Sequence, residues 1–169
     1  MKIRLVAVFV LLVGHANPTG ASEVKLADDG NARLPVVISE SASDPVKETA
    51  KTLADYLQRI SQAEFPTRTK RADLGIFVGT SLDFPESGIV NHFRPTGITR
   101  REDYLLKSDK RGLWLIGATD LAVEHAVWDL LHRLGYRQFF PGDTWEVVPT
   151  TRDLSIDVDV FESPDYHSR

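Results

Sequence analysis

The densest group of side chains that could do chemistry consists of Glu124, His125, Asp129 and His132. If this stretch is a helix, His125 and Asp129 share one face, because positions four apart are neighbours on a helix, and that spacing can hold a metal ion. Zinc peptidases, however, need His-Glu-x-x-His, and here the glutamate comes before the first histidine. The sequence identifies no third ligand either. We therefore predict no metal site and interpret these residues as the polar rim of a core helix.

The acidic residues do not reveal a catalytic pair. Glycoside hydrolysis needs two carboxyl groups that flank the scissile bond. Asp157 and Asp159 alternate with apolar residues, which is typical of the solvent side of a strand. The turn 117–120 (Gly-Ala-Thr-Asp) could cradle a phosphate at a helix start, but it has one glycine and Asp120 would repel an anion. We predict a tight turn there, no catalytic residue and no cofactor.

The three tryptophans have separate interpretations. Trp114 lies in a predicted strand and Trp128 lies beside the apolar stripe of a predicted helix, so both are expected to pack in the core. Trp145 follows a Gly-Asp-Thr segment in a predicted loop. There it could pack within the domain, stack on a sugar ring or contact another domain. Trp145 is therefore the one candidate for substrate contact.

Hydrophobic periodicity gives the elements that would position these residues. Two amphipathic helices are predicted, one over residues 45–61 after the cap Ser43 and one from the cap Thr119 to the stop signal Gly135. The predicted strands are residues 34–38, 74–79, 104–107, 113–116, 138–140, 145–148 and 154–160, with a long loop at 80–101. The expected fold is α/β (α+β), a two-layer sandwich in which a mixed sheet carries both helices on one face.

Residues 103–149 resemble the amino-terminal domain of α-glucuronidases. The shared pattern is a strand that ends in the 117–120 turn, a helix that ends in Leu134-Gly135, and the aromatic segment 139–142 (Phe-Phe-Pro-Gly). Gln62 stands near the position where the family usually has glycine. The resemblance implies a non-catalytic module related to the accessory domain of β-hexosaminidases. In that family the catalytic carboxylates belong to a following (β/α)₈ barrel, so no catalytic residue can be transferred to this chain.

The first residues are typical of a secretory signal peptide over residues 1–21. Lys2 and Arg4 precede an uncharged run of nine residues, and small residues follow. That run is far shorter than the roughly 20 apolar residues of a membrane-spanning helix. Cleavage after Ala21 or Ser22 fits equally well, while an uncleaved anchor and a buried first strand are the alternatives. We expect an exported bacterial protein, periplasmic or secreted, without a membrane span after cleavage.

Charge and composition bear on two further questions, namely the kind of partner and the source of stability. The net charge of −4 argues against a nucleic acid as partner, because phosphate binding needs clustered positive charge. The chain has no cysteine, so its stability must come from a packed core rather than from disulfides.

The leading hypothesis is the non-catalytic N-terminal accessory domain (residues 22–160) of an exported α-glucuronidase-like glycoside hydrolase that acts in the breakdown of xylan-type polysaccharides. Residues 161–169 are then the linker toward a catalytic (β/α)₈ barrel, which is the expected partner, with a glycan as a second. Two alternatives are open: a free-standing exported carbohydrate-binding module, and a small independent hydrolase.

Overall fold

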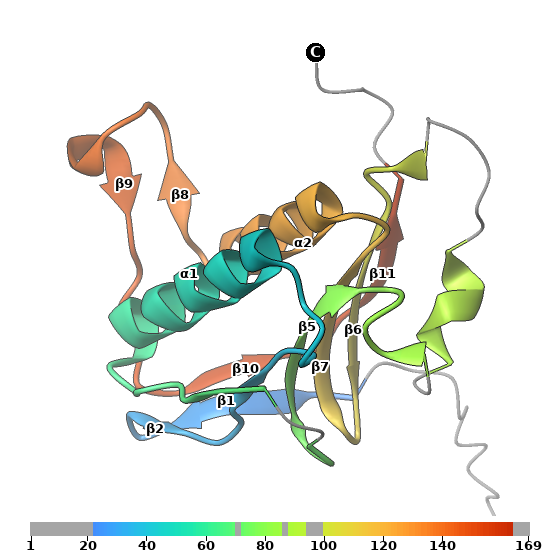
Figure 1. Cartoon of the computed structure of the whole chain (residues 1–169). Helices are drawn as coiled ribbons and strands as arrows, with labels where there is room; N and C mark the ends of the chain where they lie inside the picture. Colours follow the sequence, from blue (N-terminus) through green and yellow to red (C-terminus); the bar gives the residue numbers. More distant parts are fainter. Residues whose placement is uncertain (1–21, 70–71, 86–87, 94–99, 164–169) are drawn as a thin grey trace, which may run out of the picture.

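The computed structural model describes residues 22–69, 72–85, 88–93 and 100–163. Two helices lie on one face of a six-stranded mixed sheet, a three-stranded sheet closes one end of the core, and a two-stranded hairpin projects beyond the helices (Figure 1). This mixed α+β arrangement confirms the predicted fold class. The predicted signal peptide (1–21) and the end of the predicted linker (164–169) lie outside the described residues.

The main sheet places parallel strands beside an antiparallel pair. Its strands, in spatial order, are β11 (Asp159–Glu162), β6 (Tyr104–Asp109), β7 (Gly112–Gly117), β5 (Gly75–Thr80), β3 (Val36–Val37) and β4 (Thr67–Arg68). Strands β7, β5, β3 and β4 are parallel to one another, whereas β6 is antiparallel to both of its neighbours. The predicted hairpin between β6 and β7 is confirmed, with Gly112 at a φ of 123° after the turn. Strand β4 was not predicted, because its two residues are exposed.

Both helices begin where the capping residues predicted. Ser43 caps α1 (Asp44–Ser61) and Thr119 caps α2 (Asp120–Arg133); in each case the side-chain oxygen accepts a backbone N–H at 3.3 Å. Gly135, with a φ of 98°, follows α2 as a left-handed residue. No helix in the described part of the chain is long and apolar enough to cross a membrane.

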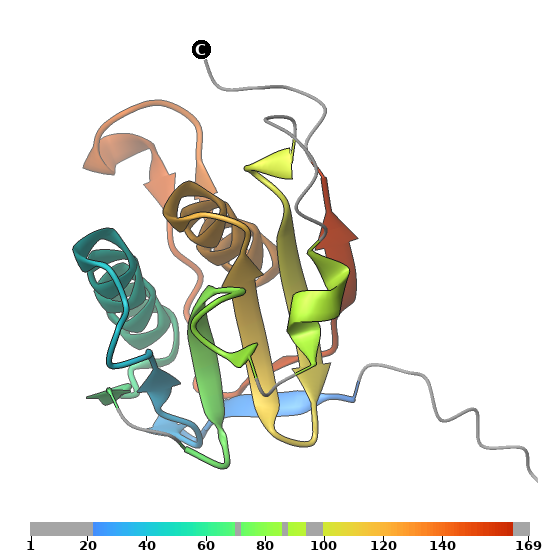
Figure 2. The same cartoon turned by 45° about the vertical axis from the view of Figure 1, so that its right-hand side comes forward.

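The central strands of the main sheet are buried on both faces. Its helix-side residues pack against the apolar faces of α1 and α2; they include Val36, Ile76, Val78, Leu106, Leu113 and Leu115. On the other face Val37, Phe77, Leu105, Trp114 and Ile116 form a second cluster with Ile89, which belongs to the short 3₁₀ helix η2 (Ile89–His92). Figure 2 shows the segment after β5 crossing this face, opposite the helices. The two-layer prediction therefore omits a partial third layer, which comes from the segment predicted as a long loop.

The three-stranded sheet corrects one prediction. Residues 154–160 are not a single strand: β10 (Leu154–Ile156) pairs with β1 (Val24–Asp28) in the three-stranded sheet, and β11 pairs with β6 in the main sheet. Val158 is buried at the crossing, and its N–H and C=O both bond to Ser108. Buried and exposed side chains alternate without a break from β10 to β11. The sequence pattern therefore could not show that the chain passes from one sheet to the other.

Further strands near the ends of the domain also differ from the predictions. Strands β1 and β2 (Asn31–Ala32) were not predicted. The predicted strand 138–140 is instead β8 (Arg137–Gln138) followed by a bend. The predicted extended segment 145–148 begins in the 3₁₀ helix η4 (Asp143–Trp145) and continues as β9 (Glu146–Val147). Strand β11 extends to Glu162, two residues into the segment predicted as a linker.

Candidate functional site: an aromatic hairpin

Strands β8 and β9 and the residues between them form a hairpin, here called the aromatic hairpin (residues 137–147). It projects past the C-terminal end of α1 (Figure 1, orange). Gly142 takes a φ of 109° at its tip. The N–H of Trp145 donates to the carbonyl of Gly142 at 3.0 Å, and the N–H of Phe139 donates to the carbonyl of Trp145 at 3.1 Å. The tip therefore has a defined backbone conformation.

The side chains of the aromatic hairpin are unusually apolar for a surface. Phe139, Phe140, Trp145 and Val147 are 65%, 61%, 51% and 51% exposed. The rings of Phe140 and Trp145 meet edge to face, with centroids 5.2 Å apart. Single exposed apolar residues are common, but several large ones on one short hairpin are typical of an interaction surface. Aromatic side chains are also the usual anchors of such interfaces.

Glu146 fastens the base of the aromatic hairpin to α1. Its carboxylate accepts hydrogen bonds from the Tyr56 hydroxyl and from the Arg59 guanidinium, and its side chain is only 9% exposed. We call these three residues the latch. Hydrogen bonds from Arg59 outweigh the opposing effect of burial and hold the pKa of Glu146 at about 2. Glu146 is therefore ionised at neutral pH and acts as an anchor.

Aromatic rings fill the space beneath the latch. Tyr56 meets Trp128 and Tyr136 edge to face, with centroids 5.4 and 5.0 Å away. The His132 ring stacks on Tyr136 at 6.0 Å. Tyr136 is 1% exposed, and burial raises the pKa of its hydroxyl. The aromatic hairpin thus rests on a packed base that joins it to both helices.

Removing the charge of Glu146 is expected to destabilise the protein only at pH values at which the Glu146 carboxyl group is ionised. The carboxyl pKa is about 2 in the folded protein and about 4.3 in an unfolded chain. The stabilisation is therefore fully present above about pH 4.3 and is lost as the pH falls through about 2. Glu146→Gln should lower the free energy of unfolding by about 1–2 kcal/mol at neutral pH, and by progressively less below about pH 4. Urea denaturation of both proteins across this pH range measures the difference.

Glu64→Gln is the matched control for this experiment, because Glu64 is exposed on the loop after α1. Its effect on the free energy of unfolding should stay within about 0.5 kcal/mol. A loss for Glu146→Gln that is equally large at neutral and at strongly acidic pH would contradict the latch. Such a result would mean that the substitution acts through packing rather than through charge.

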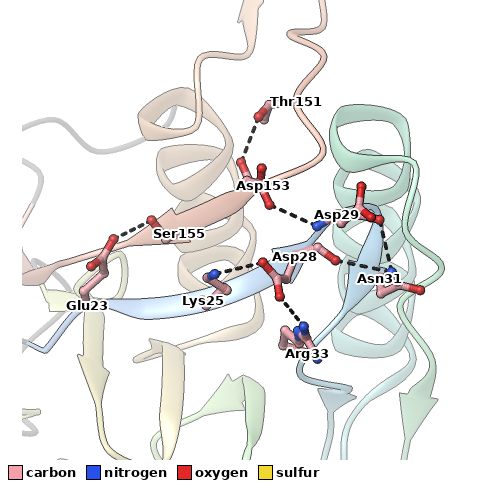
Figure 3. A network of polar contacts seen from close by, with 9 residues as sticks. All are labelled: Glu23, Lys25, Asp28, Asp29, Asn31, Arg33, Thr151, Asp153 and Ser155. Carbon is pink, nitrogen blue, oxygen red and sulfur yellow. Dashed lines mark hydrogen bonds and ion pairs between the residues drawn. The ribbon is translucent and has the colours of Figure 1, made fainter.

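Figure 3 shows a network of polar contacts around the three-stranded sheet, which includes the acids Glu23, Asp28, Asp29 and Asp153. Asp28 lies between Lys25 and Arg33, and Asp29 pairs with Arg152 at 2.9 Å. Hydrogen bonds from Lys25 and then from Arg33 lower the pKa of Asp28 to about 2. A general acid needs a raised pKa, so Asp28 is suited to holding β1 and β2 in place and not to proton transfer.

Three of the residues singled out around α2, namely Glu124, Asp129 and His132, have structural partners. Glu124 accepts a bond from the Trp128 indole at 3.4 Å, and Asp129 pairs with Arg133 at 3.1 Å and accepts from Tyr104. His132 instead stacks on the aromatic base described above. Among the described residues, no three His, Asp or Glu side chains are grouped so that they could hold a metal ion. The structure therefore spreads this set along α2, with Glu124 and His132 exposed and His125 and Asp129 half-buried.

The other predicted residues lie mostly as expected. Asp157 and Asp159 are exposed, and the 117–120 segment is a tight turn whose Asp120 accepts a hydrogen bond from Ser43 at 2.8 Å. Trp114 is 2% exposed in the far-side core. Trp145 lies on the aromatic hairpin, and contact between Trp145 and a substrate stays a prediction.

Sequence reasoning did not identify two parts of this site. The exposure of Phe139 and Phe140 was missed because apolar neighbours favour a strand, and only the following Pro-Gly signalled a turn. Glu146 was missed because its partner Arg59 is 87 residues away in the sequence.

Comparisons with known proteins place the fold. The sequence matches no protein-family model and no curated protein. Among solved structures, the chain is similar to a family GH115 4-O-methyl-α-glucuronidase with specificity for decorated arabinogalactans, at a TM-score of 0.57 and 16% identity over 82% of this chain and 18% of that one. The fold occurs in glycoside hydrolases.

Two further neighbours belong to other glycoside hydrolase families. One is the GH20 β-N-acetylhexosaminidase of Streptomyces coelicolor A3(2), with a TM-score of 0.47, 15% identity, and coverage of 87% of this chain and 25% of that one. The other is a GH138 enzyme that targets pectin rhamnogalacturonan II, with a TM-score of 0.41, 8% identity, and coverage of 72% of this chain and 15% of that one. This chain thus spans a quarter or less of each enzyme.

Proposed function

We propose that this chain is the non-catalytic accessory domain of an α-glucuronidase-like glycoside hydrolase that acts on xylan-type polysaccharides, and that the aromatic hairpin docks on the catalytic barrel. The observation that carries the proposal is the exposed group Phe139, Phe140 and Trp145 on a hairpin held to α1 by the ion pair of Glu146 with Arg59. A fixed arm loses little freedom on binding, which favours association. The fold likeness to a much longer GH115 enzyme supports the same role.

The absence of catalysis in this chain can be tested directly. We expect the purified protein to show no hydrolysis of aldouronic acids or aryl glycosides above the uncatalysed rate, because Asp28 and Asp29, two of the acids in Figure 3, are each paired with a cation. Turnover that disappears on changing a single carboxylate would overturn the proposal. The chain would then be a small independent hydrolase.

Export is the second part of the proposal and rests on residues 1–21. We expect a bacterial host to release the protein to the periplasm or the medium, with a new N-terminus at Ser22 or Glu23. N-terminal sequencing or intact mass spectrometry of the cell fractions measures this. Recovery of the whole chain in the cytoplasm, with residues 1–21 still attached, would contradict export.

A further inference from the structure

The connections after β3 and β5 diverge. These two strands are neighbours and parallel, so their carboxyl ends meet at one edge of the sheet. The chain leaves β3 toward α1 on the helix face. It leaves β5 across the opposite face, as Figure 2 shows. Where the connections after two neighbouring strands run to opposite faces of a sheet, a crevice forms beside the ends of these strands. Ligands of open α/β sheets bind in such crevices.

A groove of about 670 Å³ lies at this point. One wall comes from the residues after β3, which include Ser39 and Ser41, and another from the residues after β5, which include Asp83 and Phe84. Phe77 and Arg111 also line the groove. The volume lies within the range of about 300–1,000 Å³ that is usual for small-molecule sites.

The polar side chains of the groove are already positioned by the fold. Oδ2 of Asp83 accepts both the N–H and the hydroxyl of Thr80 at 2.7 Å, so Oδ1 is the oxygen that can accept from a ligand. The Ser39 and Ser41 hydroxyls are 2.8 Å apart. The Arg111 guanidinium lies over the Phe77 ring, 5.3 Å from its centroid. Acceptors, hydroxyls and one donor group therefore line a common space.

Apolar surface alternates with these groups. Phe84 is half-buried and meets Phe77 edge to face at 5.7 Å. Leu82, on the same wall, is 82% exposed. A ligand with both hydroxyl edges and C–H faces matches such a lining.

We propose that this groove binds a neutral sugar unit. Sugar hydroxyls can donate to Asp83 and bond to Ser39 and Ser41, while a C–H face of the ring packs on Phe84. Among the lining residues that the structure describes, two acids, Glu40 and Asp83, stand against one cation, Arg111, and this balance favours a neutral ligand over a phosphate or a carboxylate. The site does not rest on the docking proposed above, because it lies at the opposite end of α1 from the aromatic hairpin, roughly 27 Å away for a helix of 18 residues.

The test is a titration of the ¹⁵N-labelled protein with D-xylose, methyl β-D-glucopyranoside and D-glucuronate, followed by amide chemical shifts. We expect saturable shifts at residues 39–41 and 82–85 with both neutral sugars and weaker binding of D-glucuronate. Ser41→Trp fills the groove from its exposed rim and should weaken binding at least about tenfold. Glu64→Trp adds the same bulk on an exposed loop away from the groove and should bind as the unsubstituted protein does.

Three results would overturn the proposal. They are the absence of saturable shifts in the unsubstituted protein, shifts confined to residues 137–147, and unchanged binding by Ser41→Trp. Shifts confined to residues 137–147 would assign sugar binding to the aromatic hairpin instead. None of these results bears on hydrolysis, so the proposal of an accessory domain is judged separately.

Discussion

Gly112→Ala is expected to remove at least about 3 kcal/mol from the free energy of unfolding, a large part of the roughly 5–15 kcal/mol that a domain possesses. Two costs combine at this position. Gly112 has a φ of 123°, where a side chain is strained. An added Cβ would also lie 2.1 Å from the carbonyl oxygen of Gly75, on the neighbouring strand β5. Gly112 and Gly75 face each other at the first residues of β7 and β5, so relieving the contact would disturb the pairing of the two central strands at that end.

Gly142→Ala separates these two costs. Gly142 has a comparable φ of 109°, but no atom lies within 4 Å of its added Cβ. It should therefore show only the conformational cost, about 1 kcal/mol. Urea denaturation of both variants, followed by far-UV circular dichroism, measures the difference. Equal losses would show that the close approach of β7 to β5 does not constrain the sequence at residue 112.

Removing the aromatic tip is expected to abolish docking while leaving the fold intact. The double change Phe140→Ser and Trp145→Ala deletes two rings that are 61% and 51% exposed. Anchors of this kind each carry about 2 kcal/mol or more of binding free energy, so affinity for the catalytic barrel should fall at least about thirtyfold. Calorimetry with the proposed catalytic barrel, supplied as a separate chain, measures the loss. The unfolding midpoint should barely change, because neither ring belongs to a buried cluster.

Leu74→Ala is the control for docking, since Leu74 is 54% exposed outside the aromatic hairpin. It should leave the affinity for the barrel unchanged. If the double variant binds the barrel as tightly as the unsubstituted protein, the hairpin is not the docking surface. If Leu74→Ala weakens binding as strongly, the effect is general surface hydrophobicity rather than a defined interface.

The helices and the central strands could be predicted because their signals are local. The period of Val46, Ala50 and Leu53 and the cap Ser43 act within a few residues of one another, and the structure confirms them. The hairpin of β6 and β7 is equally local, since Gly112 supplies the conformation that its turn requires.

The missed features depend on distant partners. Strand β1 is short, and its pairing with β10 joins residues more than a hundred positions apart, so no neighbouring residue signals it. The latch has the same property, because Glu146 is an ordinary surface residue until Arg59 and Tyr56 face it. The groove likewise depends on where the connections after β3 and β5 cross the sheet. Local pattern therefore predicts elements, whereas sites made by several elements require the fold.

The pairing of β1 with β10 also sets the order of events during synthesis. The hydrogen bond between the side chains of Ser155 and Glu23 joins residues that are 132 positions apart in the sequence. At about 5–20 residues per second, a ribosome needs roughly ten seconds to make the segment between them. During that time the first strand of the domain has no partner in its own sheet except the short β2. The three-stranded sheet can therefore be completed only after Leu154–Ile156 has been synthesised, and until then the apolar face of β1 has no cover from β10.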